Sequence, residues 1–341
     1  GELGGDPERL AREASDQECA ARILFCDTIN EEFGRIDLNA PEIAAKYARH
    51  LREPRPYLNV SQTEVEQVLR DAAREAGMRM LLHHEAEILA QDDAGIRCRV
   101  TARDAGGPIR EIRARYVICA DGAAGRSRTK LGVGMRGPEK LQDFVNAYFT
   151  NDLRRLVNTP AKLYWILNPD CYGTLICHHP ARRWVMHVPL YPGEKPEDYT
   201  RDVFRKRIRH ALGRPDLDVR IQSISSWRMT AQVAESFRAG RAFLVGDAAH
   251  RFPPTGGLGM NSGIADAHNL CWKLAAVLRG RADATLLDSY EQERRPVIQR
   301  NCDESQRNYE EIFSVIRAFG LEPRRIALLA RLRTAPLLRQ L

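Results

Sequence analysis

The pattern of apolar and polar positions changes character twice between residues 241 and 279. The run "RAFLVG" is typical of a short buried strand, and "RFPPTGGLG" is a loop rich in proline and glycine. The residues that follow repeat apolar side chains at helical spacing. The pattern therefore predicts a strand, a loop and a helix over 259–279, with further helices over about 284–317 and 322–334.

The segment "SQTEVEQVLRDAAREAG" at 61–77 predicts a capped helix. Ser61 stands at the expected N-cap, Glu64 follows three residues later as in a capping box, and Gly77 ends the helix. The next three segments, "MRMLLHHEAEILA", "GIRCRVTA" and "PIREIRARYVICA", are separated by turns rich in Asp and Gly. They predict antiparallel strands that lead into one buried strand, "YVICA", before the turn "DGAAGRSR".

Residues 143–228 have a different hydrophobic pattern from the preceding segments. It consists of short apolar runs, with one basic helix predicted near 198–212. This stretch predicts a separate, sheet-rich lobe. We expect its aromatic and histidine side chains to pack in a core rather than to line a substrate cavity, among them Tyr164, Trp165, His187 and Trp227.

Composition narrows the classes of partner. A chain of 341 residues is long enough for two domains, and its formal charge is +7. The basic residues are scattered and no aromatic-basic module accompanies them, so we expect no nucleic-acid partner. No apolar run reaches the about 18 residues that a membrane helix needs, so we expect no membrane partner. A homo-oligomer remains compatible with the sequence.

The eight cysteines include no C-x-x-C pair, which favours reduced thiols in a cytoplasmic protein. "CHHP" at 177–180 is the one stretch that resembles a metal site. On a strand, His178 and His179 would point to opposite faces, so we expect no metal ligands there.

Two stretches carry candidate chemistry. In "GDAAHRFPPTGGLGMN" a strand ends at Gly246-Asp247, and a glycine-rich loop leads into a helix. Glycines let main-chain N–H groups approach a ligand, the helix start favours negative charge, and Asp247 can accept hydrogen bonds from hydroxyl groups. A plain strand-loop-helix connection is the alternative. "CADGAAGRSR" repeats the plan around Asp121, which predicts that two turns converge on one extended ligand.

These stretches, with "SQTEVEQVL" and "LLDSYEQERRP", resemble the FAD-dependent aromatic hydroxylases of the para-hydroxybenzoate and phenol hydroxylase type. The resemblance covers about 22–300 and is most specific over 241–296. It implies a mixed α/β fold in which a discontinuous FAD-binding domain holds an inserted sheet-rich substrate lobe and is followed by C-terminal helices.

The resemblance also implies domain boundaries. The FAD-binding domain comprises 60–135 and 236–300, and the substrate lobe comprises 22–59 and 136–235. A C-terminal helical segment over 301–341 follows.

By the same resemblance, Gln62 touches the flavin dinucleotide, Asp121 lies near the pyrophosphate and is linked to NAD(P)H use, and Asp247 binds the ribityl chain. Met260 and Asn261 meet the edge of the flavin ring, and Pro254, the one residue assigned a catalytic place, lies beside the ring and the substrate. The remaining cofactor-binding residues implied are Gly122, Arg128, Gly246, Gly256, Gly257 and Gly259. Gly125 stands where many members of the family have Ser.

The activity implied is that of a monooxygenase: NADPH or NADH reduces FAD, O2 gives a flavin 4a-hydroperoxide, and a phenol-like or polycyclic aromatic substrate is hydroxylated. A flavin-dependent halogenase is improbable, because its W-x-W-x-I-P signature is absent. A Baeyer-Villiger-type flavin oxygenase and a non-catalytic remnant that acts as a binding module remain alternatives.

The family's amino-terminal G-x-G-x-x-G fingerprint is not found in its expected place. The literal match "GVGMRG" at 132–137 follows a helical stretch instead of a strand, although the apolar residues over 141–149 have helical spacing and keep this alternative open. We therefore expect the chain to be a piece of a longer protein, and to bind FAD weakly by itself.

Overall fold

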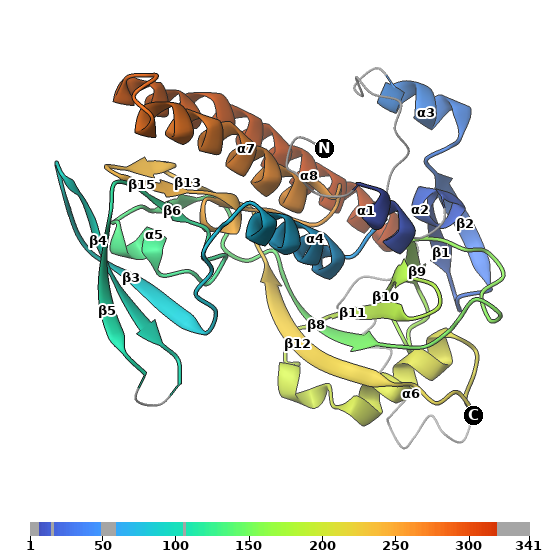
Figure 1. Ribbon diagram of the computed structural model, residues 1–341. Helices are drawn as coiled ribbons and strands as arrows, with labels where there is room; N and C mark the ends of the chain where they lie inside the picture. Colours follow the sequence, from blue (N-terminus) through green and yellow to red (C-terminus); the bar gives the residue numbers. More distant parts are fainter. Residues whose placement is uncertain (1–6, 15–16, 49–58, 105–106, 319–341) are drawn as a thin grey trace. The chain divides into compact units, whose positions relative to one another are not determined.

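The computed structural model divides the chain into two compact units, each made of separate stretches of sequence. The first, here called the large-sheet unit, contains the described residues up to Met80, Asp143–Trp227 and the last described residues, 316–318. The second, the two-turn unit, contains Leu81–Gln142 and Arg228–Val315. The residues that the structure describes are 7–14, 17–48, 59–104 and 107–318 (Figure 1).

A seven-stranded sheet forms the large-sheet unit, with the strand order β12-β8-β11-β10-β9-β1-β2. β1 pairs in parallel with β9, whereas β1–β2, β9–β10, β10–β11 and β11–β8 are antiparallel. This sheet confirms the prediction that residues 143–228 are rich in strands. Its strands are β1 (Arg22–Cys26), β2 (Glu32–Asp37), β8 (Gln142–Phe149), β9 (Leu163–Ile166), β10 (Gly173–His179), β11 (Arg183–Pro189) and β12 (Ile221–Met229).

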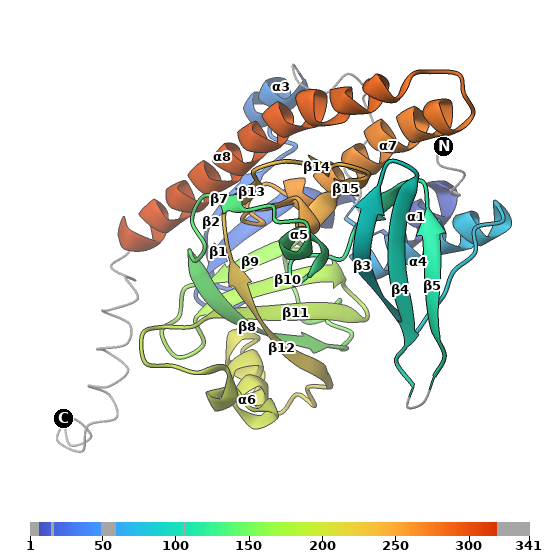
Figure 2. The same ribbon diagram turned by 90° about the vertical axis from the view of Figure 1, so that its left-hand side faces the viewer.

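One face of this sheet packs against α6 (Arg201–Ala211), which lies along it in Figure 2. Side chains of a strand alternate between its two faces, and on β8 the buried residues are Val145, Ala147 and Phe149. They form one core with Phe204 of α6. The same alternation shows that the helical interpretation of 141–149 was wrong.

The helix predicted after Ser61 is confirmed as α4 (Gln62–Glu75), but its predicted cap is wrong. Ser61 occupies the N-cap position without a side-chain bond to the helix. Instead its hydroxyl accepts a hydrogen bond from Nη1 of Arg183 at 3.0 Å, and Glu64 forms an ion pair with the same guanidinium. The charged partner on β11 thus replaces the local capping contact.

Three short helices complete the described part of this unit: α1 (Pro7–Glu13), α2 (Gln17–Ala21) and α3 (Pro41–Ala48). Nη1 of Arg9 on α1 lies 2.9 Å from Oδ2 of Asp71 on α4, which ties the first described residues to that helix.

The two-turn unit contains three small sheets. Their orders are β3-β4-β5, β14-β15-β6 and β16-β13-β7, and β15 and β6 are parallel neighbours. The antiparallel strands predicted from 78 to 120 are therefore present, divided between two of these sheets. The strands are β3 (His84–Asp92), β4 (Gly95–Ala102), β5 (Ile109–Ala114), β6 (Val117–Cys119), β7 (Met135–Arg136), β13 (Gln232–Ala234), β14 (Arg238–Ala239), β15 (Ala242–Leu244) and β16 (His250–Arg251).

Two strand predictions need correction. The strand expected from Met78 begins only at His84, because His83 has φ +58° and this left-handed conformation interrupts an extended run. The segment 108–120 forms two strands, since β5 pairs with β4 whereas β6 pairs with β15. Within β6, Cys119 is buried but Ile118 is 41% exposed, so this strand is buried on one side only.

Long helices follow β16, as predicted: α7 (Leu258–Leu278), a 3₁₀ turn η3 (Ala284–Asp288) and α8 (Ser289–Ala318). Figure 1 shows α7 and α8 side by side, and Leu270 and Leu274 of α7 share a core with Ile298 of α8. The helix predicted over 322–334 lies outside the described residues.

The "GVGMRG" segment does not form a strand-turn-helix unit. Its last residues form β7, which pairs with β13, and the next element is the strand β8. The expectation that this match stands in the wrong place is confirmed, and the alternative that it is a dinucleotide-binding fingerprint is wrong.

All eight cysteines are free thiols, and Cys271 is the exposed one. His178 and His179 are consecutive residues of β10. Among the described residues we find no group of three His, Cys, Asp or Glu side chains that could hold a metal ion. Nor does any described helix combine the length and the apolar character needed to cross a bilayer.

Candidate functional site

The two Asp-Gly turns leave the same edge of one sheet. β6 and β15 are parallel, with Cys119 paired to Leu244, and each strand runs directly into its turn. The structure therefore brings together the turns that begin at Asp121 and Asp247. The carboxyl edge of parallel strands is where α/β proteins place their ligands.

In the first turn, the Asp121 carboxylate folds back over its own loop. Its Oδ2 accepts a hydrogen bond from the backbone N–H of Ser127 at 2.9 Å, at the start of the short helix α5 (Ser127–Lys130). A Cβ on Gly125 would lie 2.2 Å from Cγ of Asp121, so a residue with a side chain there would displace the carboxylate. Gly122 lies between them, and Asp121 stays exposed to solvent.

In the second turn, Gly246 has φ +57° and opens a 3₁₀ turn η2 (Gly246–Ala248). A left-handed conformation of this kind favours glycine. Asp247 is exposed, and its carboxylate receives no hydrogen bond from the part of the chain that the structure describes. It is thus available to accept hydrogen bonds from a ligand.

One arginine shortly after each turn adds positive charge near this edge: Arg128 on α5 and Arg251 on β16. Arg128 donates from Nη1 to the carbonyl of Val133 at 2.7 Å, while its Nε is buried without a partner among the described residues. Arg251 donates from Nε to the carbonyl of Asp247 at 3.4 Å. Burial lowers the pKa of Arg251, and the charge of Arg128 lowers it further. The two guanidinium groups therefore repel each other, and an anion at this edge would relieve that repulsion.

The glycine-rich loop ends at α7, whose N-cap is Gly257 with φ +67°. Asn261 donates from Nδ2 to the carbonyl of Gly257 at 2.9 Å, and Met260 is 42% exposed. A Cβ on Gly259 would meet nothing within 4 Å. The first amides of α7 have no partner within the helix, so this loop can present several N–H groups to a ligand.

Two hydrogen bonds join the loop to α8. Oγ1 of Thr255 donates to the carbonyl of Ser305 at 2.6 Å, and Nδ2 of Asn308 donates to the carbonyl of Thr255 at 3.1 Å. Gly256 packs beside Asn308, and Pro254, on the other side of Thr255, is exposed.

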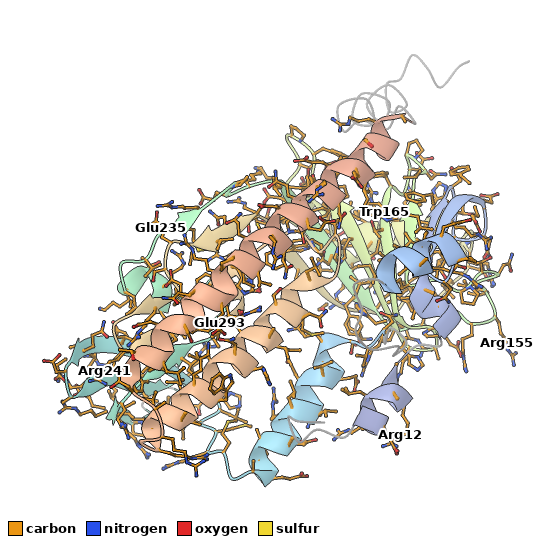
Figure 3. All side chains as sticks on the ribbon, turned by 90° about the horizontal axis from the view of Figure 1, so that it is seen from above. Arg12, Arg155, Trp165, Glu235, Arg241 and Glu293 are labelled. Carbon is orange, nitrogen blue, oxygen red and sulfur yellow. The ribbon has the colours of Figure 1, made fainter. Side chains whose placement is uncertain are left out.

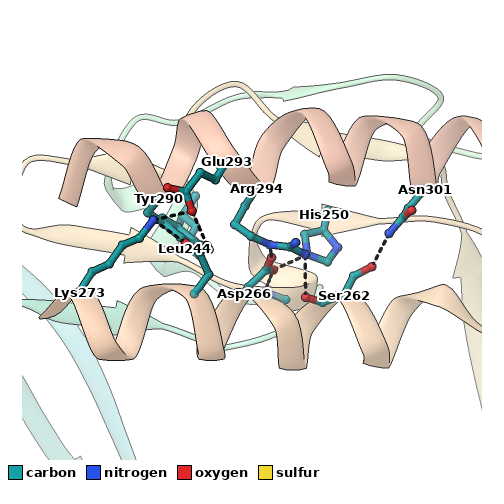
Figure 4. Close-up of polar contacts among 11 residues, drawn as sticks. Leu244, His250, Ser262, Asp266, Lys273, Tyr290, Glu293, Arg294 and Asn301 are labelled. Carbon is teal, nitrogen blue, oxygen red and sulfur yellow. Dashed lines mark hydrogen bonds and ion pairs between the residues drawn. The ribbon is translucent and has the colours of Figure 1, made fainter. Parts of the chain in front are cut away.

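A buried polar network joins the second turn to α7 and α8 (Figure 4). Asp266 accepts hydrogen bonds from the Gly246 amide at 3.1 Å, Nε2 of His250 at 2.7 Å and Nε of Arg294 at 2.8 Å. Asp266 is fully buried, and Nδ1 of His250 has no partner among the described residues. The sequence interpretation missed this network, although an Asp on the apolar face of a predicted helix was its signal.

Gln62 does not belong to the unit that contains this edge. It lies on α4 of the large-sheet unit, where Nε2 donates to Oε1 of Glu66 at 2.8 Å. The other predicted residues all belong to the two-turn unit.

The lobe residues divide between the two faces of the large sheet. Tyr164 is fully buried and packs near Trp184, which confirms its predicted place in the core. Trp165, labelled in Figure 3, is the next residue of β9. Because side chains alternate along a strand, it belongs to the opposite face of the sheet. On that face His187 and Trp227 are half-buried, with ring centroids 5.9 Å apart.

The histidine of this face is held neutral. Burial, followed by the charge of His178, lowers the pKa of His187 to about 4. Trp227 stacks on Phe144 with ring centroids 4.9 Å apart, and its Nε1 donates to Oδ1 of Asn146 at 2.9 Å. The face thus combines aromatic rings with uncharged polar groups.

Known proteins resemble this chain in sequence and in fold. A family described as "FAD binding domain" matches residues 5–305. The tetracenomycin A2 monooxygenase-dioxygenase of Streptomyces glaucescens is 39% identical over 258 residues, which cover 73% of this chain and 46% of that protein.

Two solved structures are similar in fold and sequence. The flavin-dependent monooxygenase PieE, in complex with FAD and substrate, has a TM-score of 0.85 and 31% identity, over 96% of this chain and 58% of that one. A ternary complex of aklavinone-11 hydroxylase with FAD and aklavinone has a TM-score of 0.81 and 31% identity, over 91% and 59%. The chain thus spans about half the length of the relatives that it matches.

Proposed function

Because the chain belongs to the FAD-binding-domain family, we propose that its two-turn unit binds FAD as part of a flavin-dependent aromatic monooxygenase. One observation supports this most directly: two Asp-Gly turns leave one sheet edge beside each other, and the Asp247 carboxylate there has no hydrogen-bond donor from the described chain. A dinucleotide offers what this edge lacks, namely hydroxyl groups for the carboxylate and phosphates for the arginines.

The residues present fit this cofactor. Asp247 would accept hydrogen bonds from the ribityl hydroxyls, and Asp121, Gly122 and Arg128 would lie near the pyrophosphate. Neither carboxylate is buried or ion-paired, and Arg128 has a buried Nε without a partner among the described residues. These are groups for which a polar ligand would supply the missing contacts.

The glycine-rich loop would hold the flavin ring. The open space beside Gly259 and the left-handed Gly257 let the backbone at 256–261 approach a planar group closely. Gly246 and Gly256 keep the turn and loop free of side chains, and Met260 and Asn261 would meet the ring edge. The exposed Pro254 would lie beside the ring and the substrate.

We propose that one unit binds FAD and the other holds the substrate, as predicted from the sequence. The two-turn unit contains most of the predicted FAD-binding stretches 60–135 and 236–300, and the large-sheet unit contains most of the substrate lobe predicted over 22–59 and 136–235. The difference concerns residues 60–80, which cluster with the large sheet because α4 pairs with Arg183 of β11. Gln62, on α4, stays a proposed contact of the flavin dinucleotide.

The proposed reaction hydroxylates an aromatic small molecule with O2 and NADPH or NADH, without a nucleic-acid partner. Bound FAD would supply the redox chemistry, and the protein would position the ring, exclude water and hold the substrate. The half-buried face with Trp227, Phe144 and a neutral His187 suits a planar aromatic ring with polar substituents. We propose a phenol-like or polycyclic aromatic substrate, because the similar proteins are named for polyketides as well as for phenols.

The test is direct. FAD is titrated into the complete protein, and oxidation of NADPH and NADH is followed with and without a panel of phenols and polycyclic aromatic substrates. The proposal expects stoichiometric FAD, faster oxidation with a substrate, and hydroxylated product in proportion to the O2 consumed. Bound FAD with neither stimulation nor product across such a panel would contradict the monooxygenase and favour a binding module.

A further inference from the structure

The buried carboxylate of Asp266 has contacts on both sides of Asp247 along the chain. It accepts from the amide of Gly246, which precedes Asp247, and from the imidazole of His250, which follows it by three residues. Asp247 itself is exposed. The exposed carboxylate thus stands on a backbone segment whose two ends are tied to one buried side chain.

We propose that Asp266 is a positioning residue. Its ion pair with Arg294 holds the carboxylate in place, and the carboxylate in turn holds the Gly246 amide and the His250 ring. These contacts determine the position from which Asp247 binds its ligand. The inference rests on the proposed function, because it concerns the site assigned to FAD. Asp266 is fully buried, so it would act through its protein contacts and not by touching the ligand.

The chemistry of the cluster requires a carboxylate. A buried charge needs a partner, and Nε of Arg294, 2.8 Å from Oδ1, supplies it from α8. The other oxygen, Oδ2, then receives the amide of Gly246 and Nε2 of His250. An asparagine at 266 has one acceptor oxygen instead of two, so either Arg294 or the Gly246 amide would face an NH2 group.

The same two helices carry a second ion pair that does not reach the turn, which provides a matched control. Nζ of the buried Lys273 on α7 lies 2.8 Å from Oε2 of Glu293 on α8 (Figure 4). Glu293 also accepts from Nδ2 of Asn269 at 2.7 Å. In the described structure neither Lys273 nor Glu293 forms a hydrogen bond or ion pair with residues 246–261. If Asp266 only joined α7 to α8, loss of its charge would affect the second turn no more than loss of the charge of Glu293.

The experiment compares Asp266→Asn with Glu293→Gln in the complete protein. The first readout is hydrogen exchange of backbone amides in the flavin-free state, which needs no cofactor. We expect Asp266→Asn to speed exchange at residues 245–251 about tenfold, since the Gly246 amide loses its acceptor. Glu293→Gln should leave exchange at 245–251 unchanged, even where it lowers the melting temperature.

The second readout is the FAD affinity of the folded fraction, with the visible circular dichroism of the bound flavin. Asp266→Asn should weaken FAD binding about tenfold and alter the dichroism, whereas Glu293→Gln should change neither. If Asp266→Asn does not fold, Arg294→Lys takes its place, because it keeps the charge but loses the Nε donor.

Equal effects of the two variants on local exchange would overturn the inference, as would normal exchange at 245–251 in Asp266→Asn. A wild-type protein without FAD affinity would count against the proposed function instead. The exchange readout would still decide the role of Asp266 in that case.

Discussion

Gly263 of α7 lies directly against Gly246 of the second turn: a Cβ on Gly263 would stand 3.4 Å from the Cα of Gly246. This approach brings α7 close enough for Asp266, one turn further on, to reach the Gly246 amide. A methyl group at 3.4 Å is an ordinary van der Waals contact, whereas a larger side chain would push the helix from the turn.

Gly263→Ala is therefore expected to be neutral or stabilising by up to about 1 kcal/mol, because alanine favours a helix over glycine. Gly263→Leu should destabilise by about 1 to 3 kcal/mol through overpacking. Denaturant unfolding of the two variants checks this. Equal tolerance of alanine and leucine would contradict the close contact.

Asp247→Ala should weaken FAD binding by the complete enzyme about ten- to a hundredfold, the effect of removing a hydrogen bond to a charged group. Asp247→Asn should weaken it less, because one acceptor remains. The melting temperature should hardly change, since the carboxylate is exposed and receives no bond from the described chain. Flavin titration beside thermal melts measures both effects. Asp104→Ala, which removes an exposed carboxylate after β4, is the control.

Gly259→Ala separates ligand approach from stability. Its Cβ would meet no protein atom within 4 Å, and the position is helical, so the variant should be as stable as the parent or more so. FAD affinity should nevertheless fall about tenfold if the amides here lie against the flavin. Unchanged affinity together with unchanged stability would show that the ligand does not approach this glycine.

Thiol reactivity should single out Cys271. It is the exposed cysteine, on α7, whereas burial raises the pKa of Cys26 and of Cys171 to about 12. A thiol reagent should modify about one cysteine quickly in the native protein and all eight after unfolding. The fast phase should accelerate as the pH rises, because partial burial also raises the pKa of Cys271. Loss of the fast phase in Cys271→Ser confirms the assignment, and its persistence contradicts it.

Acid should destabilise the large-sheet unit through His187. Its pKa is lowered from 6.5 to about 4 in the folded protein, so between these values the unfolded chain binds the proton more readily. The free energy of unfolding is therefore highest above pH 6.5 and should fall as the pH drops toward 4. His187→Gln should reduce this slope, as measured by urea unfolding at pH 7 and pH 5.

The exposed His210 of α6 gives the matched control, because solvent surrounds it before and after unfolding. His210→Gln should keep the slope of the parent protein. An unchanged slope in His187→Gln would contradict the neutral state of that half-buried imidazole.

Periodicity alone predicted the elements with strong local signals. α4, α7 and α8 were evident because apolar residues recur at helical spacing, and β15 because a short apolar run ends at Gly246. The two Asp-Gly turns were also evident, since their residue types are typical of strand ends. Local chemistry is enough for such features, because each depends on neighbours in sequence.

Partners distant in sequence decided the rest. The choice of strand over helix for residues 142–149 came from pairing with β11, and Ser61 lost its capping role to Arg183. No local pattern shows which strand adjoins which, or which charge a side chain will meet.

The candidate site shows the same division. Asp121 and Asp247 were identifiable from sequence, but they share one edge only because β6 and β15 pair in parallel. Asp266 is contacted by three donors that the fold brings around it, from the turn, β16 and α8. The sequence by itself determined which residue types stand at the ends of the strands, and the tertiary structure decided which of them stand together, because contacts between distant residues form only when the chain packs its core.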